Sequence, residues 1–280
     1  MRKILTVGII SRLDKEQAVK TAEEIGRFLE ERGIKVLYDA SLAPLLGKKG
    51  DRLEDRDLDL AVILGGDGTI LRAIHILKRG IPILALNFGT VGFLADVSPE
   101  NALDALQKVL DGRFRKEDCF MLSNNVGLPD ALNEIRIGTV VPSQMVRFGV
   151  SIDSMPVAYD RADAILVATT TGASGYTMSA GGSVIDPRLK AMVIVPVCPL
   201  SSNFKSYVIP WDSEVSVKVE GPSEFVVIVD GQFSRRLKAP EEIIIRRSMD
   251  NVTFFRVEQG FYERLRRRLA VSSLDFRASP

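Results

Sequence analysis

The short segment GGDGT (65–69) combines residue types that suit phosphate binding. It follows the apolar run DLAVIL (59–64), which predicts a buried strand, and it precedes a stretch with helical periodicity (69–78). Glycine lets the backbone approach a ligand closely, and a helix N-terminus offers free N–H groups to an anion. We therefore predict phosphate contacts at four positions, with the threonine as a hydroxyl donor: Gly65, Gly66, Gly68 and Thr69.

Asp67 stands in the middle of this turn, where a carboxylate would repel phosphate unless it has a task of its own. It could hold Mg²⁺ between phosphate oxygens, or accept a hydrogen bond from an attacking hydroxyl group. The glycine spacing matches neither GxxxxGK[ST] nor GxGxxG. The alternative is a tight turn between strand and helix in which Asp67 is exposed and does no chemistry.

A second segment, ATTTGASGYTMSAGG (168–182), is dense in hydroxyl groups and small residues. Such a segment suits a nucleotide, because the base can lie against the backbone while hydroxyl groups contact its polar edge. The alternative is a surface loop rich in Ser, Thr and Gly. Three polar residues at predicted strand ends could contact a base or a ribose, or could simply be solvated: Asn133, Glu134 and Asp163.

The composition argues against several classes of protein. The 280 residues are 46% hydrophobic and 26% charged, as in a soluble globular protein. Lys and Arg total 37 and Asp and Glu total 36, so no global basic field favours nucleic acid. Cys119 and Cys198 alone form no disulfide framework and no zinc site. No apolar run is long enough to span a bilayer. We expect a cytoplasmic protein that binds neither nucleic acid nor membrane.

The first 120 residues alternate between strand and helix periodicity, which predicts a Rossmann-like α/β domain with a parallel sheet. Residues 40–58 are polar and irregular and predict a mobile loop. A Ser98-Pro99 pair predicts the start of a helix. The other predicted strands are 4–10, 35–39 and 81–86, and a further helix is predicted over 15–32.

After about residue 120, short apolar or alternating segments separated by turns predict a mainly β domain, a sandwich or a barrel-like body. The segment FYERLRRRLA (261–270) predicts a short, solvated basic helix. We therefore expect an α/β domain over 1–120, a β-domain over 121–255, and a tail over 256–280.

Taken together, the motifs resemble the NAD kinase family, and the archaeal members most closely. GGDGT alone is not specific, because lipid kinases and phosphofructokinases carry similar turns, but its combination with an Asn-Glu pair and TGxSxYxxSxGG is. The similar segments occur in the family's order over nearly the whole chain: GGDGT (65–69), NFGTVGFLAD (87–96), LNE (132–134), TGASGYTMSAGG (171–182) and VDGQ (229–232).

The resemblance implies an N-terminal α/β domain, a C-terminal β-sandwich domain that binds NAD, and a tail that packs back on the first domain. It implies transfer of a phosphoryl group from ATP, with Mg²⁺ held mainly by the donor phosphates, to the 2′-hydroxyl of the adenosine ribose of NAD. Polyphosphate as donor and NADH as acceptor stay open. It also implies a homodimer or homotetramer in which a neighbouring subunit completes part of the NAD site.

By position, the resemblance places Asp67 against the 2′-hydroxyl and Gly66, Gly68 and Thr69 beside the phosphates. Because the transition state of phosphoryl transfer is loose, we expect Asp67 to orient the hydroxyl first and to accept its proton second. Arg72 is a candidate contact to the donor, one helical turn further on. The other positions implied to bind NAD are Gly68, Asn133, Glu134, Arg161, Asp163, Thr171, Ser174, Tyr176 and Ser179.

Several residues depart from the family pattern on the NAD side. These are Ala164 for Gly, Thr170 for Pro, Ala173 for a hydroxyl residue, Leu200 for His and Lys205 for Arg. They leave Asp67 intact but bear on how the acceptor is held. Two alternatives therefore stand beside an NAD kinase: a nucleotide-binding regulator of the same fold with weak or no turnover, and a diacylglycerol-type lipid kinase.

Overall fold

The computed structural model describes residues 3–89, 92–141, 144–221, 224–258 and 260–274. Contacts between Cα atoms divide the chain into two compact units: Met1–Asp118 with Val252–Pro280, and Cys119–Asn251. Two long strands, β6 (Arg115–Asn124) and β16 (Glu241–Arg256), contribute residues to both units and pair with each other.

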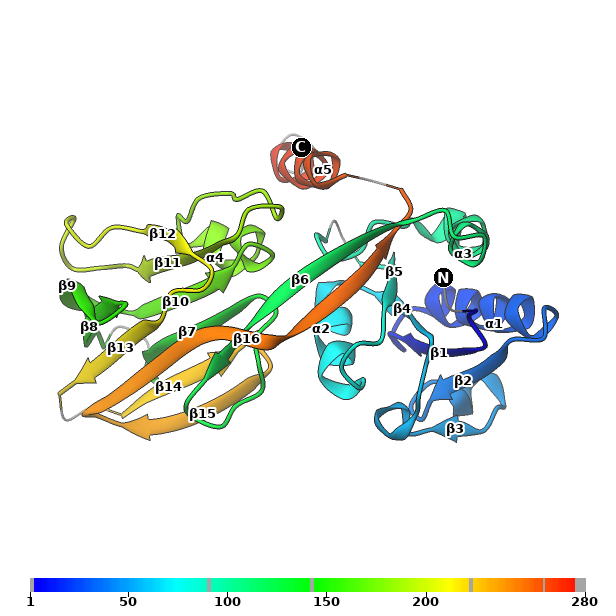
Figure 1. Ribbon diagram of the computed structural model, residues 1–280, viewed down its shortest axis with the longest axis horizontal. Coiled ribbons are helices and arrows are strands. Elements are labelled where there is room, and N and C mark those ends of the chain that lie inside the picture. Colours follow the sequence, from blue (N-terminus) through cyan, green and yellow to red (C-terminus); the bar gives the residue numbers. More distant parts are fainter. Residues whose placement is uncertain (1–2, 90–91, 142–143, 222–223, 259, 275–280) are drawn as a thin grey trace, which may run out of the picture. The chain divides into compact units, whose positions relative to one another are not determined.

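The first unit contains a parallel sheet in the order β3-β2-β1-β4-β5, which the end of β16 extends in parallel through Phe254 and Ile83 (Figure 1). Every residue of β4 is buried, as expected for a strand covered on both faces. The strands are β1 (Thr6–Ser11), β2 (Lys35–Asp39), β3 (Gly50–Asp51), β4 (Leu60–Gly65) and β5 (Ile83–Asn87).

The helices of this unit follow the predicted apolar periodicity, with small differences at their ends. Helix α1 (Glu16–Glu30) buries Ala18, Ala22, Ile25 and Leu29, while α2 (Asp67–Ile76) starts two residues earlier than its apolar pattern. The Ser98-Pro99 start leads first into a 3₁₀ turn, η3 (Pro99–Asn101), and then into α3 (Ala102–Leu110). The segment predicted as an irregular loop instead contains η1 (Ala43–Leu46), β3 and η2 (Leu53–Asp55).

The strand order explains where a ligand can bind in the first unit. The chain runs from β1 to β2 and β3 on one side, and then returns to place β4 on the other side of β1. In open parallel sheets, ligands bind beyond the carboxyl ends of the strands at such a reversal. The GGDGT turn begins at the carboxyl end of β4 and therefore lies at this position.

The second unit contains antiparallel sheets, as the alternating segments predicted. One sheet has the order β12-β11-β10-β7-β14-β15, and the strands β9, β8, β13 and β16 follow one another in the other. One core of buried side chains, which includes Phe148, Phe225 and Ile245, is formed from strands of both. The strands not yet given are β7 (Glu134–Thr139), β8 (Val146–Ile152), β9 (Met155–Ala162), β10 (Ala164–Thr169), β11 (Ala191–Val197), β12 (Tyr207–Pro210), β13 (Val215–Glu220), β14 (Glu224–Val229) and β15 (Phe233–Lys238).

The chain returns to the first unit at its C-terminal end, which confirms the predicted tail. The final helix is α5 (Phe261–Leu274); Gln259 and residues 275–280 lie outside the described residues. The prediction of a solvated basic helix is wrong for Arg264, whose side chain is only 4% exposed because it packs beside Glu117. Among the described helices, none combines the length and the apolar character that crossing a membrane requires.

Candidate active site

The GGDGT turn joins β4 to α2 through a glycine-lined backbone. Gly66 is the N-cap in an extended conformation (φ −92°, ψ −178°), and its carbonyl accepts hydrogen bonds from the N–H groups of Thr69 (2.9 Å) and Ile70 (3.1 Å). A Cβ added at Gly65 would clash with the side chain of Thr69, whereas one added at Gly68 would meet nothing within 4 Å. The turn is therefore packed on its strand side and open at Gly68, where a phosphate can approach the start of the helix.

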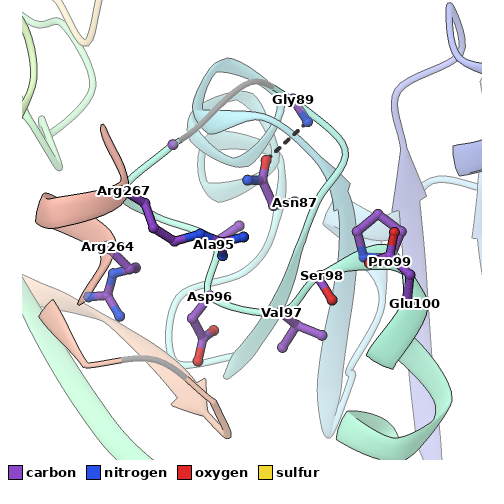
Figure 2. Close-up of a pocket in the computed structure, with 11 residues that line it drawn as sticks. Asn87, Gly89, Ala95, Asp96, Val97, Ser98, Pro99, Glu100, Arg264 and Arg267 are labelled. Carbon is purple, nitrogen blue, oxygen red and sulfur yellow. Dashed lines mark hydrogen bonds between the residues drawn. The ribbon is translucent and has the colours of Figure 1, made fainter. Parts of the chain in front are cut away.

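A second turn, at the end of β5, packs against the first. The Phe88 N–H donates to the Gly65 carbonyl at 3.1 Å, and the Gly89 N–H donates to Asn87 Oδ1 at 3.0 Å (Figure 2). A Cβ added at Gly89 would lie 3.1 Å from Gly66 Cα, so the two glycine backbones approach each other closely. Thr90 and Val91 of the same predicted motif lie outside the described residues.

The Asp67 carboxylate is held by backbone groups of the loop that follows. Its Oδ2 accepts the Phe93 N–H at 3.0 Å, and its Oδ1 accepts the Leu94 N–H at 3.1 Å. A Cβ added at Gly92 would clash with Oδ1, so a residue without a side chain is required beside the carboxylate. Each oxygen retains a second acceptor direction. Asp67 is thus partly buried and oriented, and it can still accept a hydrogen bond from a hydroxyl group.

A cavity of about 300 Å³ lies beside this loop (Figure 2). Asn87, Gly89 and Gly92 line part of it, and Arg264 and Arg267 of α5 line another part. Two carboxylates, Asp96 and Glu100, balance the two arginines in charge. The cavity therefore adjoins the two glycines that contact Gly66 and Asp67.

One cation near the turn was missed by the sequence analysis. Arg12, at the end of β1, donates from Nη1 to the Phe88 carbonyl at 3.1 Å and from Nε to Asp14 Oδ1 at 2.8 Å. Its side chain is 24% exposed, which leaves it accessible at the strand reversal. No local pattern in the sequence relates residue 12 to residue 88, because the parallel sheet alone brings them together. Of the predicted donor contacts, Thr69 is partly buried and Arg72 is exposed on α2.

In the second unit, Asp230 organises the LNE segment. Its Oδ1 accepts the N–H groups of Asn133 (2.7 Å) and Glu134 (3.2 Å), and its Oδ2 accepts that of Leu132 (2.9 Å). Three hydrogen bonds from consecutive amides fix the backbone that carries Asn133 and Glu134. The motif VDGQ contained Asp230, but only the pairing of β14 with β7 shows its partners.

Three buried side-chain atoms of the second unit have no hydrogen-bond partner in the described part of the chain: Asn133 Oδ1, Glu134 Oε2 and Thr177 Oγ1. Burial, and then the nearby charge of Asp230, raise the pKa of Glu134 to about 7. Unsatisfied buried polar atoms cost free energy, so such atoms on the adjacent residues Asn133 and Glu134 point to a polar ligand. Thr177 belongs to the hydroxyl-rich segment 168–182 but is not among the predicted site residues.

The TGASG segment packs directly on Asn133 and Glu134. A Cβ added at Gly172 would overlap the Asn133 carbonyl oxygen, and one added at Gly175 would lie 3.6 Å from Glu134 Oε2. Ser174 is buried and donates to the Thr171 carbonyl at 2.9 Å. Thr171 is partly buried, whereas Tyr176 and Ser179 are exposed. The structure therefore brings together LNE and TGASGY, as the resemblance implied.

Arg161 and Asp163 do not join this group within one chain. Strand β7 pairs with β10 so that Glu134 lies opposite Ala168, whereas Gly138 lies opposite Ala164. Asp163 therefore lies at the far end of β10, about 17 Å from Ala168 at about 3.3 Å per residue. The departure at Ala164 fits locally, because its methyl group faces Gly138, where an added Cβ would come within 2.7 Å.

The other departures differ in their surroundings. Thr170 and Ala173 are buried, whereas Leu200 is 56% exposed and Lys205 is exposed. Within the described ranges, no three His, Cys, Asp or Glu side chains come together as a metal site.

The chain is similar to known proteins over most of its length. The family model of the ATP-NAD kinase N-terminal domain matches residues 7–114, and that of the ATP-NAD kinase C-terminal domain matches residues 132–257. An NAD kinase from Methanothermobacter thermautotrophicus is 37% identical over 279 residues, covering 97% of this chain and 99% of that protein. One from Thermococcus kodakarensis is 37% identical over 264 residues, covering 91% of this chain and 95% of that protein.

Two solved structures have the same fold. The crystal structure of an NAD kinase from Archaeoglobus fulgidus in complex with ATP has a TM-score of 0.78 at 28% identity, covering 94% of this chain and 99% of that chain. Yeast NADH kinase complexed with NADH has a TM-score of 0.87 at 22% identity, a likeness of fold alone; the match covers 100% of this chain and 90% of that chain. The two family models together cover most of the sequence and each contains one of the two sites, and so the chain belongs to the NAD kinase family.

Proposed function

We propose that this protein transfers a phosphoryl group from ATP to the 2′-hydroxyl of the adenosine ribose of NAD, giving NADP. The observation that carries the proposal is the Asp67 carboxylate, held by the N–H groups of Phe93 and Leu94 at the start of α2. In-line transfer to a hydroxyl group requires an oriented hydrogen-bond acceptor for that hydroxyl, next to a place for the phosphates. The open, glycine-lined start of the helix provides such a place beside Asp67. The family membership and the NAD kinases of Methanothermobacter and Thermococcus support this activity.

The proposed mechanism uses few groups, because phosphoryl transfer depends mainly on positioning and charge neutralisation. The donor phosphates lie by Gly66, Gly68 and Thr69, with Arg72 as a further contact from α2. Asp67 accepts a hydrogen bond from the 2′-hydroxyl group and aims the hydroxyl oxygen at the γ-phosphorus of ATP. It takes the proton as the new O–P bond forms, while the bond from the γ-phosphorus to the β,γ-bridging oxygen breaks and ADP leaves. We propose that Mg²⁺ enters with the phosphates of ATP, where it would neutralise their charge. Both carboxylate oxygens of Asp67 already accept hydrogen bonds from backbone N–H groups. This arrangement suits a side chain that accepts a hydrogen bond from a hydroxyl group better than one that coordinates a metal ion.

The proposed NAD site uses the buried polar atoms of the second unit. Asn133 Oδ1, Glu134 Oε2 and Thr177 Oγ1 would gain partners from an adenine edge and ribose hydroxyls. Tyr176 and Ser179 are exposed and would cover the base, while Thr171 and Ser174 shape the backbone behind it. The donor, ATP or polyphosphate, and the acceptor, NAD or NADH, are distinguished by an assay of activity.

We propose that the protein acts as a homodimer or homotetramer. Arg161 and Asp163 lie at the far end of β10 from Glu134, so they would reach NAD from a second copy, at the new phosphate and the nicotinamide end respectively. Light scattering of the active enzyme tests this, because a monomer with full activity would contradict it.

We also propose domains over 1–120 with 256–280, and over 121–255; the two compact units lie close to these bounds. We also propose a cytoplasmic location, because the chain has only two cysteines and therefore no disulfide framework, and cell fractionation tests it.

One assay tests the proposed activity against its alternatives. The purified protein is incubated with ATP, Mg²⁺ and NAD, and NADP is measured with an NADP-specific dehydrogenase. NADP formation is the expected result. Phosphorylation of diacylglycerol without NADP would favour a lipid kinase, and NAD binding without turnover would favour a regulator. Replacing ATP by polyphosphate, and NAD by NADH, defines the donor and the acceptor in the same format.

The raised pKa of Glu134 predicts that NAD affinity depends on pH. Because this pKa is about 7 in the free protein, the carboxyl group is mostly ionised at pH 8 and mostly protonated at pH 6. A carboxylate accepts hydrogen bonds from ribose hydroxyl groups better than a carboxylic acid does. The affinity for NAD should therefore fall as the pH drops, with a slope that approaches about tenfold per pH unit below pH 7. Calorimetric titration of NAD without ATP at pH 6, 7 and 8 measures this. Glu134→Gln should bind more weakly at pH 8 and lose the slope; an unchanged slope would remove Glu134 from the explanation.

A further inference from the structure

A buried ion-pair cluster lies behind the loop that holds Asp67, within the first unit. The side chain of Arg256, the last residue of β16, is 4% exposed, and that of Asp96 is fully buried. Arg256 donates from Nε and Nη2 to Glu117 Oε1 at 3.2 and 2.9 Å, and its Nη1 lies 3.5 Å from Asp96 Oδ1. Because the Arg256 guanidinium group is almost completely buried and lies against two carboxylates, its orientation is fixed.

The same guanidinium contacts the loop itself. Arg256 Nη1 donates to the Leu94 carbonyl, while the Leu94 N–H donates to Asp67 Oδ1 at 3.1 Å. Leu94 is therefore hydrogen-bonded on both sides. Its carbonyl accepts from Arg256 of the C-terminal segment, and its N–H donates to the Asp67 carboxylate.

Asp96 fixes the next part of the same loop. Its Oδ2 accepts the N–H groups of Val257 at 3.1 Å and Glu258 at 3.3 Å. Figure 2 shows Asp96 between this loop and Arg264 of α5. The loop over residues 92–96 is thus tied to the returning C-terminal chain on one side and to Asp67 on the other.

We propose that Arg256 is a positioning residue for the phosphoryl transfer, acting through Leu94 on the Asp67 carboxylate. The inference rests on the role proposed for Asp67 above. A rotation of the peptide groups around Leu94 would turn its N–H away from Asp67 Oδ1. The carboxylate would then lose the orientation in which it faces the hydroxyl group. Small errors in such an angle are costly, since catalytic geometry must be held within about 10–20°. Arg256 supplies the restraint without touching either substrate.

Arg256→Lys is the first test, because it keeps the charge but replaces the planar fork with a single ammonium group. That group cannot reproduce the bonds to Glu117 and Leu94 together. The expected result is a fall in kcat of about tenfold, with KM for ATP and NAD within about twofold of the wild type. Arg115→Lys is the matched control, because Arg115 binds the same Glu117 from an exposed position. A kcat of Arg256→Lys equal to that of the control would overturn the proposal.

A double-mutant cycle separates positioning from a general loss of structure. If Arg256 acts only through Asp67, then Arg256→Lys should cause no further loss of kcat in the Asp67→Asn background. A further tenfold loss there would show an independent, structural effect and would contradict the proposal. The pair R256Q/E117Q, which removes one charge of each sign, should show the same fall and the same dependence on Asp67. It serves as the variant if Arg256→Lys folds poorly.

Amide hydrogen exchange distinguishes this proposal from the proposed activity. In the protein without substrates, NMR-detected exchange at the Phe93 and Leu94 N–H groups should become about tenfold faster in Arg256→Lys and stay unchanged in Arg115→Lys. Faster exchange in a protein that makes no NADP would support the restraint and contradict the activity. Unchanged exchange in an active enzyme would overturn the restraint alone.

Discussion

Asp67→Asn is expected to lower kcat by about two orders of magnitude or more, the range for loss of a positioned acid–base group, with little change in NAD affinity. The structure gives two reasons for the loss. The amide lacks the negative charge that accepts the proton of the 2′-hydroxyl. It also places an NH₂ group opposite either the Phe93 N–H or the Leu94 N–H, where two donors meet, so the side chain loses its orientation as well.

The measurement is kcat and KM from NADP formation, with NAD affinity measured separately by calorimetry. Asp59→Asn is the matched control, since Asp59 also accepts two backbone N–H groups, from Leu5 and Thr6, but precedes β4 at its opposite end. The control should lose some stability and keep its kcat. Full activity in Asp67→Asn would remove Asp67 from the mechanism.

Gly172→Ala is expected to raise KM for NAD at least about tenfold while leaving KM for ATP within about twofold. The added methyl group would overlap the Asn133 carbonyl, which is backbone and cannot turn aside as a flexible side chain can. The LNE strand must then shift away from TGASG, and this shift moves Asn133 and Glu134 together. Overpacking of this kind costs about 1–3 kcal/mol of stability in addition.

Gly149→Ala in the same unit is the control for this variant. There the added Cβ would lie 3.6 Å from the nearest atom, in Tyr159, which is ordinary contact. The kinetics of the control should match the wild type. A Gly172→Ala enzyme with normal KM for NAD and a lowered melting temperature would show that this contact stabilises the fold without shaping the acceptor site.

Both predictions depend on contacts that the motifs alone did not describe. The sequence predicted Asp67 as the reactive group and placed Gly172 in a segment predicted to bind a nucleotide. It did not indicate that Phe93 and Leu94 hold the carboxylate, or that Gly172 faces a carbonyl of the LNE segment. Periodicity places a residue on a strand or in a turn, but it does not say which backbone N–H of a distant loop will face it.

The fold class follows from local patterns, and the structure and the family confirm it. Buried apolar runs such as 59–64, and helical spacing such as that of Ala18, Ala22 and Ile25, encode elements through interactions within a few residues. The ends of these elements were less well predicted. The structured turns within 40–58 and the 3₁₀ start before α3 depend on hydrogen bonds that periodicity does not detect.

The sequence by itself determined the two domain types and the order of the family motifs, and it predicted Asp67 as the reactive carboxylate. Only the tertiary structure decided the partners of that carboxylate, the hydrogen bonds of Asp230 to the LNE backbone, the place of Arg12 beside Phe88, and the hydrogen bond from Arg256 to the Leu94 carbonyl. It also decided that Asp163 lies at the far end of β10 from Glu134. The physical reason is that local patterns specify elements, whereas strand register and the return of the C-terminal chain determine which polar groups, far apart in sequence, come within hydrogen-bond distance.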